Sequence, residues 1–298
     1  MNFEDTILNK IDRQRFQKNI LENSEMRSRY LTMKREKVDA FRPSMDDFVD
    51  TIPGGQEEID QDKREVALRK REFAAACEGD VEMQAVHEIA EIYEGVLIDQ
   101  IEKSEWFGSR CTIQVTSEYD DIKHGIDGVG IFKNEDAASD YIGFGIDVTF
   151  ASDIKILTKK LESIKAVVRE KKLPFVKYFT DEDDNHISIQ VPKVIVGARL
   201  ASAEQLIHLW ASQDKDKREK LATHPMQSKL IMESLWQLRY FYEYATQVDN
   251  EEAAYAYGKL YNTFYDIFLE KEELIHEHWV DIQDDSVFQA IKEYTGNA

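Results

Sequence analysis

Two apolar segments that each carry a single aspartate constrain the fold of this chain more than any other feature. They are GIDGVGIF, which contains Asp127, and YIGFGIDVTFA, which contains Asp147. Both segments are typical of buried strands, and the loop over 133–140 would join them as a hairpin, with Asp127 opposite Ile146 or Asp147. Residues opposite each other lie about 5 Å apart across a ladder. Because a buried charge is costly unless it is paired, hydrogen-bonded or metal-bound, we expect Asp127 and Asp147 to share a divalent cation.

The segment after the second strand predicts a helix from Ser152 to Lys172, with Ser152 as its N-cap. Its apolar residues repeat at helical spacing and form one stripe: Ile154, Leu157, Leu161, Ile164 and Val168. Lys160 lies about 60° from that stripe. Suppose that the helix folds back over the strand. Measured from Ser152, Lys160 then lies roughly 12 Å along the helix and Asp147 roughly 16 Å back along the strand, so the two residues reach nearly the same level. We therefore expect the Lys160 ammonium group to reach the carboxylate pair.

A second amphipathic helix is predicted over 81–103, before the strands. Its apolar face consists of Val86, Ile89, Tyr93, Leu97 and Ile101. Among the glutamates of this helix, only Glu94 is close to the apolar edge, about 80° from Val86; the alternative is a solvated helix face. Asp120 and Asp121 lie just upstream of Asp127 and are typical of a turn. Either of them could also lean toward a metal ion.

Taken together, an acidic residue on one strand, an acidic residue on the next and then a lysine, with helices before and after, resemble the PD-(D/E)XK nuclease superfamily. The phrase HGIDGVGIF is similar to the Asp-bearing strand of its Mrr-type restriction endonucleases, and the resemblance covers about residues 82–200. The order of elements read from periodicity agrees with the α+β fold that the resemblance implies, a central α-β-β-β-α-β restriction-endonuclease-like core. One departure is that the second motif should read Asp-x-Lys, whereas Thr149 follows Asp147 and Val148 here. Some members carry the lysine on the following helix, which would make Lys160 the equivalent residue.

The resemblance implies a metal-dependent nuclease that hydrolyses phosphodiester bonds in nucleic acid, with DNA favoured over RNA. Asp127, Asp147, Lys160 and Glu94 would be catalytic. Asp127, Asp147 and Glu94 would hold Mg²⁺ or Mn²⁺, which polarises the phosphate and lowers the pKa of a bound water. Lys160 would orient or deprotonate that water. If no lysine occupies this place, the fold would persist as a binding module without catalysis.

Composition divides the chain into three regions. Residues 1–62 predict a helical arm followed by a Pro- and Gly-containing acidic linker over 43–62; residues 63–200 contain the restriction-endonuclease-like core; residues 201–298 predict a helical C-terminal domain. The arm is solvated, bound to a partner or bound to nucleic acid. Tryptophans and tyrosines at helical spacing in the last region are typical of a helix core, and stacking on bases is the alternative. This region could also bind a protein partner.

Charge and composition limit the remaining function classes. The formal net charge of −20 over 298 residues argues against unspecific adhesion to nucleic acid, although eight basic residues face three acidic ones over 153–177. No signal peptide or membrane-spanning run is apparent, so no membrane partner is expected. Cys77 and Cys111 form no metal-binding spacing, which fits a cytoplasmic location. The alternatives to an active nuclease are a catalytically inactive nuclease fold and an acidic helical interaction module from a phage or mobile element.

Overall fold

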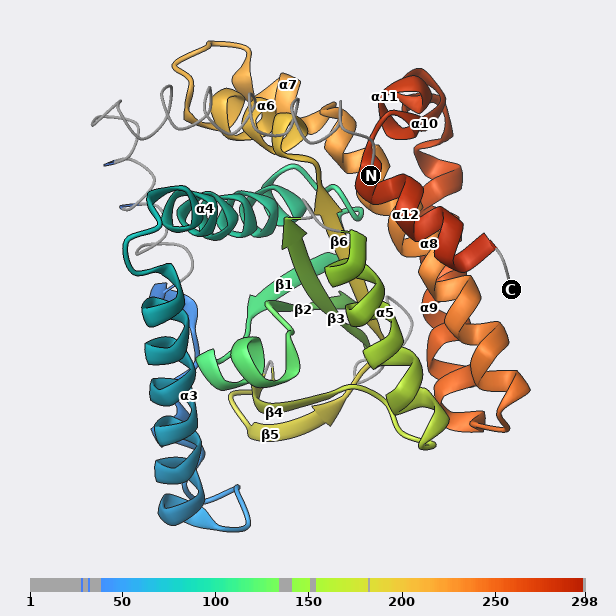
Figure 1. The fold of residues 1–298 in the computed structure, drawn as a ribbon. Helices are drawn as coiled ribbons and strands as arrows, with labels where there is room; N and C mark the ends of the chain where they lie inside the picture. The colour runs from blue at the N-terminus through green and yellow to red at the C-terminus, as the bar shows by residue number, and fades with distance from the viewer. Residues whose placement is uncertain are drawn as a thin grey trace.

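The computed structural model describes residues 39–133, 141–150, 154–181 and 183–296, together with residues 28 and 32. The predicted mixed α+β class is confirmed: a four-stranded sheet is surrounded by helices, and a second, two-stranded sheet lies beside it (Figure 1). Most of the predicted arm, the hairpin loop over 134–140 and the predicted N-cap Ser152 lie outside the described residues.

The main sheet combines a meander with one parallel strand. Its order is β1 (Cys111–Val115), β2 (Gly128–Lys133), β3 (Tyr141–Phe150) and β6 (Lys193–Ala198). The first three strands are antiparallel, and β6 runs parallel to β3. The helices α4 (Val81–Lys103) and α5 (Ile154–Arg169) precede the meander and follow it. These two helices and the strands of the main sheet thus follow one another as helix, three strands, helix and strand, with β4 and β5 inserted before the last strand.

A hairpin is inserted between α5 and the last strand of the main sheet. It consists of β4 (Phe175–Thr180) and β5 (His186–Gln190), which pair only with each other among the described strands. The sequence ISIQVPKVIVGA allowed either two strands or one long bent strand. It forms β5 and β6, two strands in separate sheets, because Pro192 between them cannot donate a backbone hydrogen bond.

The register of the hairpin brings the two aspartates close together. The regular pairing of β2 with β3 ends where Gly128 pairs with Ile146. The Asp127 N–H also donates a hydrogen bond, at 2.8 Å, to the Ile146 carbonyl, so the ladder is irregular at this residue. The Asp127 carboxylate accepts a hydrogen bond from the N–H of Val148, the residue after Asp147. The two aspartates are therefore neighbours, with Asp127 beside Ile146, one of the two positions that the sequence predicted.

The predicted apolar stripes pack against this sheet. On α5 the stripe residues Leu157, Leu161, Ile164 and Val168 are buried, and on α4 so are Ile89, Tyr93, Leu97 and Ile101. A single apolar cluster extends from these helices through the sheet into α8, α9 and α12. Burial of each large aliphatic side chain stabilises the fold by about 1.5–3 kcal/mol. This packing fixes α5 over the strands and so fixes the position of Lys160.

The C-terminal region is helical, as predicted; its first two helices lie above α4, and the others lie along the β6 side of the sheet (Figure 1). Its helices are α6 (Leu200–Ala211), α7 (Lys217–Ala222), α8 (Pro225–Gln247), α9 (Glu251–Glu270), α10 (Glu272–Glu277), α11 (Trp279–Gln283) and α12 (Ser286–Gly296). The breaks follow local polar stretches, such as SQDKD before α7. Among the described residues, no helix is long and apolar enough to span a bilayer.

Helix α8 covers the free edge of β6, and its side chains form hydrogen bonds with the backbone of that strand. The side chain of Gln237 accepts a hydrogen bond from the Ile195 N–H at 2.9 Å and donates one to the Ile195 carbonyl at 2.7 Å. Glu233 accepts from the Gly197 N–H at 3.0 Å, and Lys229 donates to the Gly197 carbonyl. These three α8 residues are spaced by four, so they form one row on the helix. The row satisfies the hydrogen-bonding groups of an edge strand that is buried.

The region over 43–62 differs from the predicted linker. A short 3₁₀ turn η3 (Asp39–Phe41) precedes a second one, η4 (Met45–Phe48), and the helix α3 (Gly55–Cys77) begins inside the segment that was predicted to be a linker. Its apolar residues join a small second core that contains Phe48, Ile52, Ile59, Val66, Tyr119 and Tyr178. The apolar residues over 43–62 are scattered among many acidic ones. The composition of this segment therefore gave no indication that it packs into a core.

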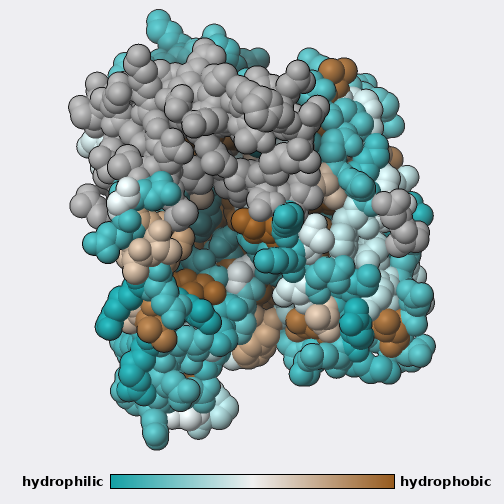
Figure 2. Space-filling view, viewed as in Figure 1, coloured by the Kyte–Doolittle hydropathy of each residue, from teal (hydrophilic) through white to brown (hydrophobic). Residues whose placement is uncertain are grey.

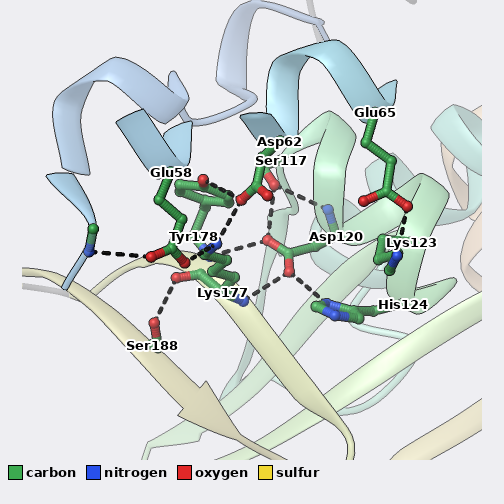
Figure 3. A network of polar contacts seen from close by, with 11 residues as sticks. Glu58, Asp62, Glu65, Ser117, Asp120, Lys123, His124, Lys177, Tyr178 and Ser188 are labelled. Carbon is green, nitrogen blue, oxygen red and sulfur yellow. Dashed lines mark hydrogen bonds and ion pairs between the residues drawn. The ribbon is translucent and has the colours of Figure 1, made fainter. Parts of the chain in front are cut away.

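A buried polar network fastens α3 to β4 (Figure 3). The Lys177 ammonium group lies 2.6 Å from the Asp62 carboxylate and also contacts Glu58, and the Tyr178 hydroxyl donates to Asp62 at 2.7 Å. Lys177 is one of the eight basic residues counted over 153–177. Its ammonium group forms ion pairs with both acids of α3.

Candidate active site

Asp147 is buried between two lysines from different elements. Its Oδ1 lies 2.5 Å from the Lys160 Nζ on α5, and its Oδ2 lies 2.7 Å from the Lys193 Nζ at the start of β6. Lys193 also donates to the His124 carbonyl at 3.1 Å. Gly125, with a φ of +60°, passes so close that an added Cβ would lie 3.2 Å from the Lys193 Nζ. A glycine is therefore required here by both its backbone conformation and the space available.

The position of Lys160 determines its charge. Burial acts to lower the pKa of the Lys160 ammonium group, but the Asp147 carboxylate beside it has the opposite and prevailing effect, so the pKa is raised. Lys160 therefore remains protonated at neutral pH. In this arrangement it can supply positive charge and a hydrogen-bond donor, which fits the role of orienting a water molecule.

Asp127 lies in an acidic cluster with Glu94 and Asp121. One carboxylate oxygen from each of the three residues lies within 4.8 Å of the others. Asp127 also accepts a hydrogen bond of 2.5 Å from the Val148 N–H. Burial, followed by the charges of Glu94, Asp147 and Asp121, raises the pKa of Asp127 well above its usual value, although the Val148 N–H acts in the other direction. The surroundings of Asp127 therefore disfavour the charged form of its carboxyl group.

The turn between β1 and β2 positions Asp121 in this cluster. It forms a single π-helical turn, η5 (Asp120–His124), whose first residue is fixed to β4. The Asp120 carboxylate accepts hydrogen bonds from the Lys177 and Tyr178 N–H groups at 2.7 and 3.0 Å (Figure 3). It also accepts one from the Ser117 hydroxyl at 2.7 Å. Asp120 is thus a structural residue, and by anchoring the turn it leaves the next residue to join Glu94 and Asp127.

An arginine from outside the sheet enters the same cluster. The Arg42 Nη2 lies 2.9 Å from the Asp121 carboxylate and 3.6 Å from that of Glu94, and its Nη1 donates to the Thr116 carbonyl at 3.0 Å. The charges of Asp121, Glu94 and Asp127 outweigh the burial of Arg42 and raise the pKa of its guanidinium. Arg42 is therefore the resident cation of the acidic cluster.

The structure divides the predicted site residues into two adjoining groups. Asp127 and Glu94 meet in the acidic cluster, where Asp121 takes the third place that was predicted for Asp147. Asp147 instead pairs with Lys160, as the fold-back geometry predicted, and with a second lysine. The predicted ligand set of Asp127, Asp147 and Glu94 thus lies within one region but is not one cluster.

Two residues of this region were missed by the sequence interpretation. Lys193 could have been found, because it is a lone charge in the apolar run VPKVIVGA, the same signal that identified Asp127 and Asp147. Arg42 had no comparable signal. It lies in the polar N-terminal region, and its contact with residues of α4 and η5 depends entirely on how the chain folds back.

A cavity of about 810 Å³ adjoins the acidic cluster between α3 and α4. Glu94, Asp121 and Arg42 are among its lining residues, so the cavity borders the cluster. Elsewhere, in the part of the surface that the structure describes, Figure 2 shows mainly hydrophilic residues with hydrophobic ones in small separate patches. The cavity is therefore the concave feature most directly connected to the candidate site.

The comparisons with known proteins find no match. No family model, no curated protein and no solved structure matches the chain.

Proposed function

We propose that this protein is a metal-dependent nuclease of the PD-(D/E)XK type, which hydrolyses phosphodiester bonds in nucleic acid. The observation that carries the proposal is the proximity of two buried aspartates, one just before β2 and one in β3: Asp127 lies among further carboxylates, and Asp147 contacts two ammonium groups. The element order α4-β1-β2-β3-α5-β6 supports it, because it is the order that this superfamily resemblance implies.

The acidic cluster is suited to a divalent cation such as Mg²⁺ or Mn²⁺. Asp127, Glu94 and Asp121 would provide hard oxygen ligands, and ionisation of Asp127 would accompany binding because its pKa is raised in the absence of metal. The cation would polarise the phosphate and supply an activated water. Arg42 would have to leave Glu94 and Asp121, while its hydrogen bond to Thr116 could keep it nearby.

The two lysines would supply the positive charge on the other side of the reacting phosphate. Lys160 is about one-third exposed at its side chain, whereas Lys193 is buried. We assign Lys160 the role of stabilising the negative charge that develops on the phosphate oxygens, since it is protonated and reaches solvent. Lys193 would hold Asp147 in place.

Cleavage of supercoiled plasmid, single-stranded DNA and RNA in Mg²⁺ or Mn²⁺ tests the proposal. The expected result is metal-dependent nicking that Asp127→Asn and Asp147→Asn each reduce by about 10²-fold or more. Asp266→Asn on the exposed face of α9 is the matched control and should retain full activity. Cleavage that persists in both site variants, or that chelation of the metal does not affect, would contradict it.

A catalytically inactive nuclease fold is the second candidate, and the charge balance of the site favours it. Four carboxylates, those of Glu94, Asp121, Asp127 and Asp147, face three cations, Arg42, Lys160 and Lys193, so little charge is left for a metal to neutralise. Thr149, where the superfamily motif has lysine, points the same way. Nucleic-acid binding without turnover and without dependence on metal would identify this alternative.

A further inference from the structure

The cavity beside the acidic cluster has two chemically different walls. Its α3 wall carries Arg69, Lys70 and Phe73, and its α4 wall carries His87 and several glutamates. Arg42 and two carboxylates of the acidic cluster, those of Glu94 and Asp121, also line the cavity. A ligand in this cavity would therefore meet a cationic and aromatic wall on one side and would border the candidate metal site.

Phe73 is the feature that points to a ligand. Its side chain is 44% exposed although it is a large apolar residue, and its ring centre lies 4.5 Å from that of His87 on the opposite wall. The two rings are inclined by 55° and are not stacked flat on each other. An accessible aromatic face between two helices is the kind of surface on which a nucleobase stacks.

The basic residues of the α3 wall lie where a nucleic-acid backbone would pass. Arg69 and Lys70 are more than half exposed at their side chains and form surface ion pairs with Glu72 and Glu118. Such exposed pairs contribute little energy, so a phosphate can replace the carboxylate partner at small cost. Arg42 is a third basic residue that lines the cavity, and it contacts Asp121 of the acidic cluster.

The size of the cavity limits the form of nucleic acid that it can accept. A volume of about 810 Å³ is within the range of sites for small ligands. It can accept one nucleotide, whereas a base pair held in a duplex cannot turn its face toward Phe73 without leaving the helix.

We propose that this cavity binds one unpaired nucleotide of a single-stranded nucleic acid, its base against Phe73 and its phosphate toward Arg42 and the acidic cluster. The inference rests on the proposed function for the identity of that phosphate as the one to be cleaved. The stacking itself does not require catalysis. Single-stranded DNA and single-stranded RNA offer the same chemistry, and separate binding measurements distinguish them.

Fluorescence anisotropy with the full chain tests the proposal. The probes are a fluorescein-labelled 20-residue single strand, as DNA and as RNA, and the DNA duplex of the same sequence, each with Ca²⁺ in place of Mg²⁺ to limit turnover. We expect one or both single strands to bind at least about tenfold more tightly than the duplex. Phe73→Ala should weaken that binding by about 5- to 100-fold, the range expected for loss of one stacked base, and Phe73→Tyr should restore it.

Controls separate this proposal from the proposed function. Tyr255→Ala removes a 71%-exposed aromatic from α9 and should leave binding unchanged. Circular dichroism would verify that Phe73→Ala is folded, and His87→Ala provides a second substitution in the cavity. If Asp127→Asn retains single-strand binding but no plasmid or oligonucleotide is ever cleaved, the nuclease proposal fails and the nucleotide site stands. Equal binding of duplex and single strand, no binding, or no effect of Phe73→Ala and His87→Ala would overturn the nucleotide site.

Discussion

Lys193 contacts Asp147 from a neighbouring parallel strand, with its Nζ 2.7 Å from the carboxylate Oδ2. The register that pairs Gly145 with Lys193 places the lysine two residues before the aspartate along the sheet. Lys160, on α5, contacts the other carboxylate oxygen, Oδ1. Asp147 is thus a buried carboxylate with one buried and one partly exposed lysine partner. The contribution of each lysine to the stability of the protein can be measured separately.

The two lysines should contribute unequally to stability. Lys193→Met removes a buried partner from a buried carboxylate and should lower the free energy of unfolding by about 3 kcal/mol. Lys160→Met removes a more exposed partner and should cost about 1 kcal/mol. Urea denaturation of both variants provides the comparison. Equal losses would show that the burial of Lys193 has no energetic consequence.

Arg42 and a divalent cation should compete for the acidic cluster. Arg42→Gln removes the guanidinium from Asp121 and Glu94, so the variant should bind Mn²⁺ about tenfold more tightly, a gain of about 1.4 kcal/mol. Without metal it should be less stable, because the carboxylates then repel one another. The melting temperature as a function of Mn²⁺ concentration measures both effects.

The control for this experiment is Arg239→Gln. Arg239 forms an exposed ion pair with Glu243 on α8 and does not belong to the site. If Arg42→Gln and Arg239→Gln respond to Mn²⁺ in the same way, Arg42 does not occupy the metal position.

Asp127 should limit the stability of the fold at neutral pH. Its pKa is raised in the folded protein, chiefly by burial, so the folded state loses stability as pH rises above the unfolded value near 4. Asp127→Asn removes this penalty and can still accept the hydrogen bond from Val148. We expect its melting temperature at pH 7.5 to rise by roughly a few degrees while metal binding is lost. Differential scanning calorimetry with and without Mn²⁺ measures both; a lower melting temperature would contradict the assignment.

Glu233 provides a second pH-dependent contribution, far from the candidate site. Burial raises its pKa to about 8, with Lys229 acting in the opposite direction. The folded protein therefore holds a proton that the unfolded chain releases near pH 4.5, and the associated stability is lost as pH rises from about 4.5 to 8. In Glu233→Gln the fall in unfolding free energy over this range should be shallower by up to about 1.4 kcal/mol per pH unit. Chemical denaturation at pH 5, 6, 7 and 8 tests this, and identical slopes in both proteins would refute it.

The sequence by itself determined the elements that local chemistry controls. The apolar runs predicted the meander and its two aspartates, and the position of the loop limited the residue opposite Asp127 to Ile146 or Asp147. The helical repeat of α5 predicted that Lys160 would reach Asp147. These features depend on residues that are close in the chain, so their geometry follows from known strand and helix dimensions.

Only the tertiary structure decided how distant segments complete the site. The partners of Asp127 come from α4 and η5, and Arg42 reaches the cluster from a polar region whose sequence contains no sign of the contact. Similarly, the polar row on α8 reads as a solvated helix face, yet it satisfies the backbone of β6. Long-range contacts of this kind depend on which surfaces are buried together, and local periodicity carries no information about that choice.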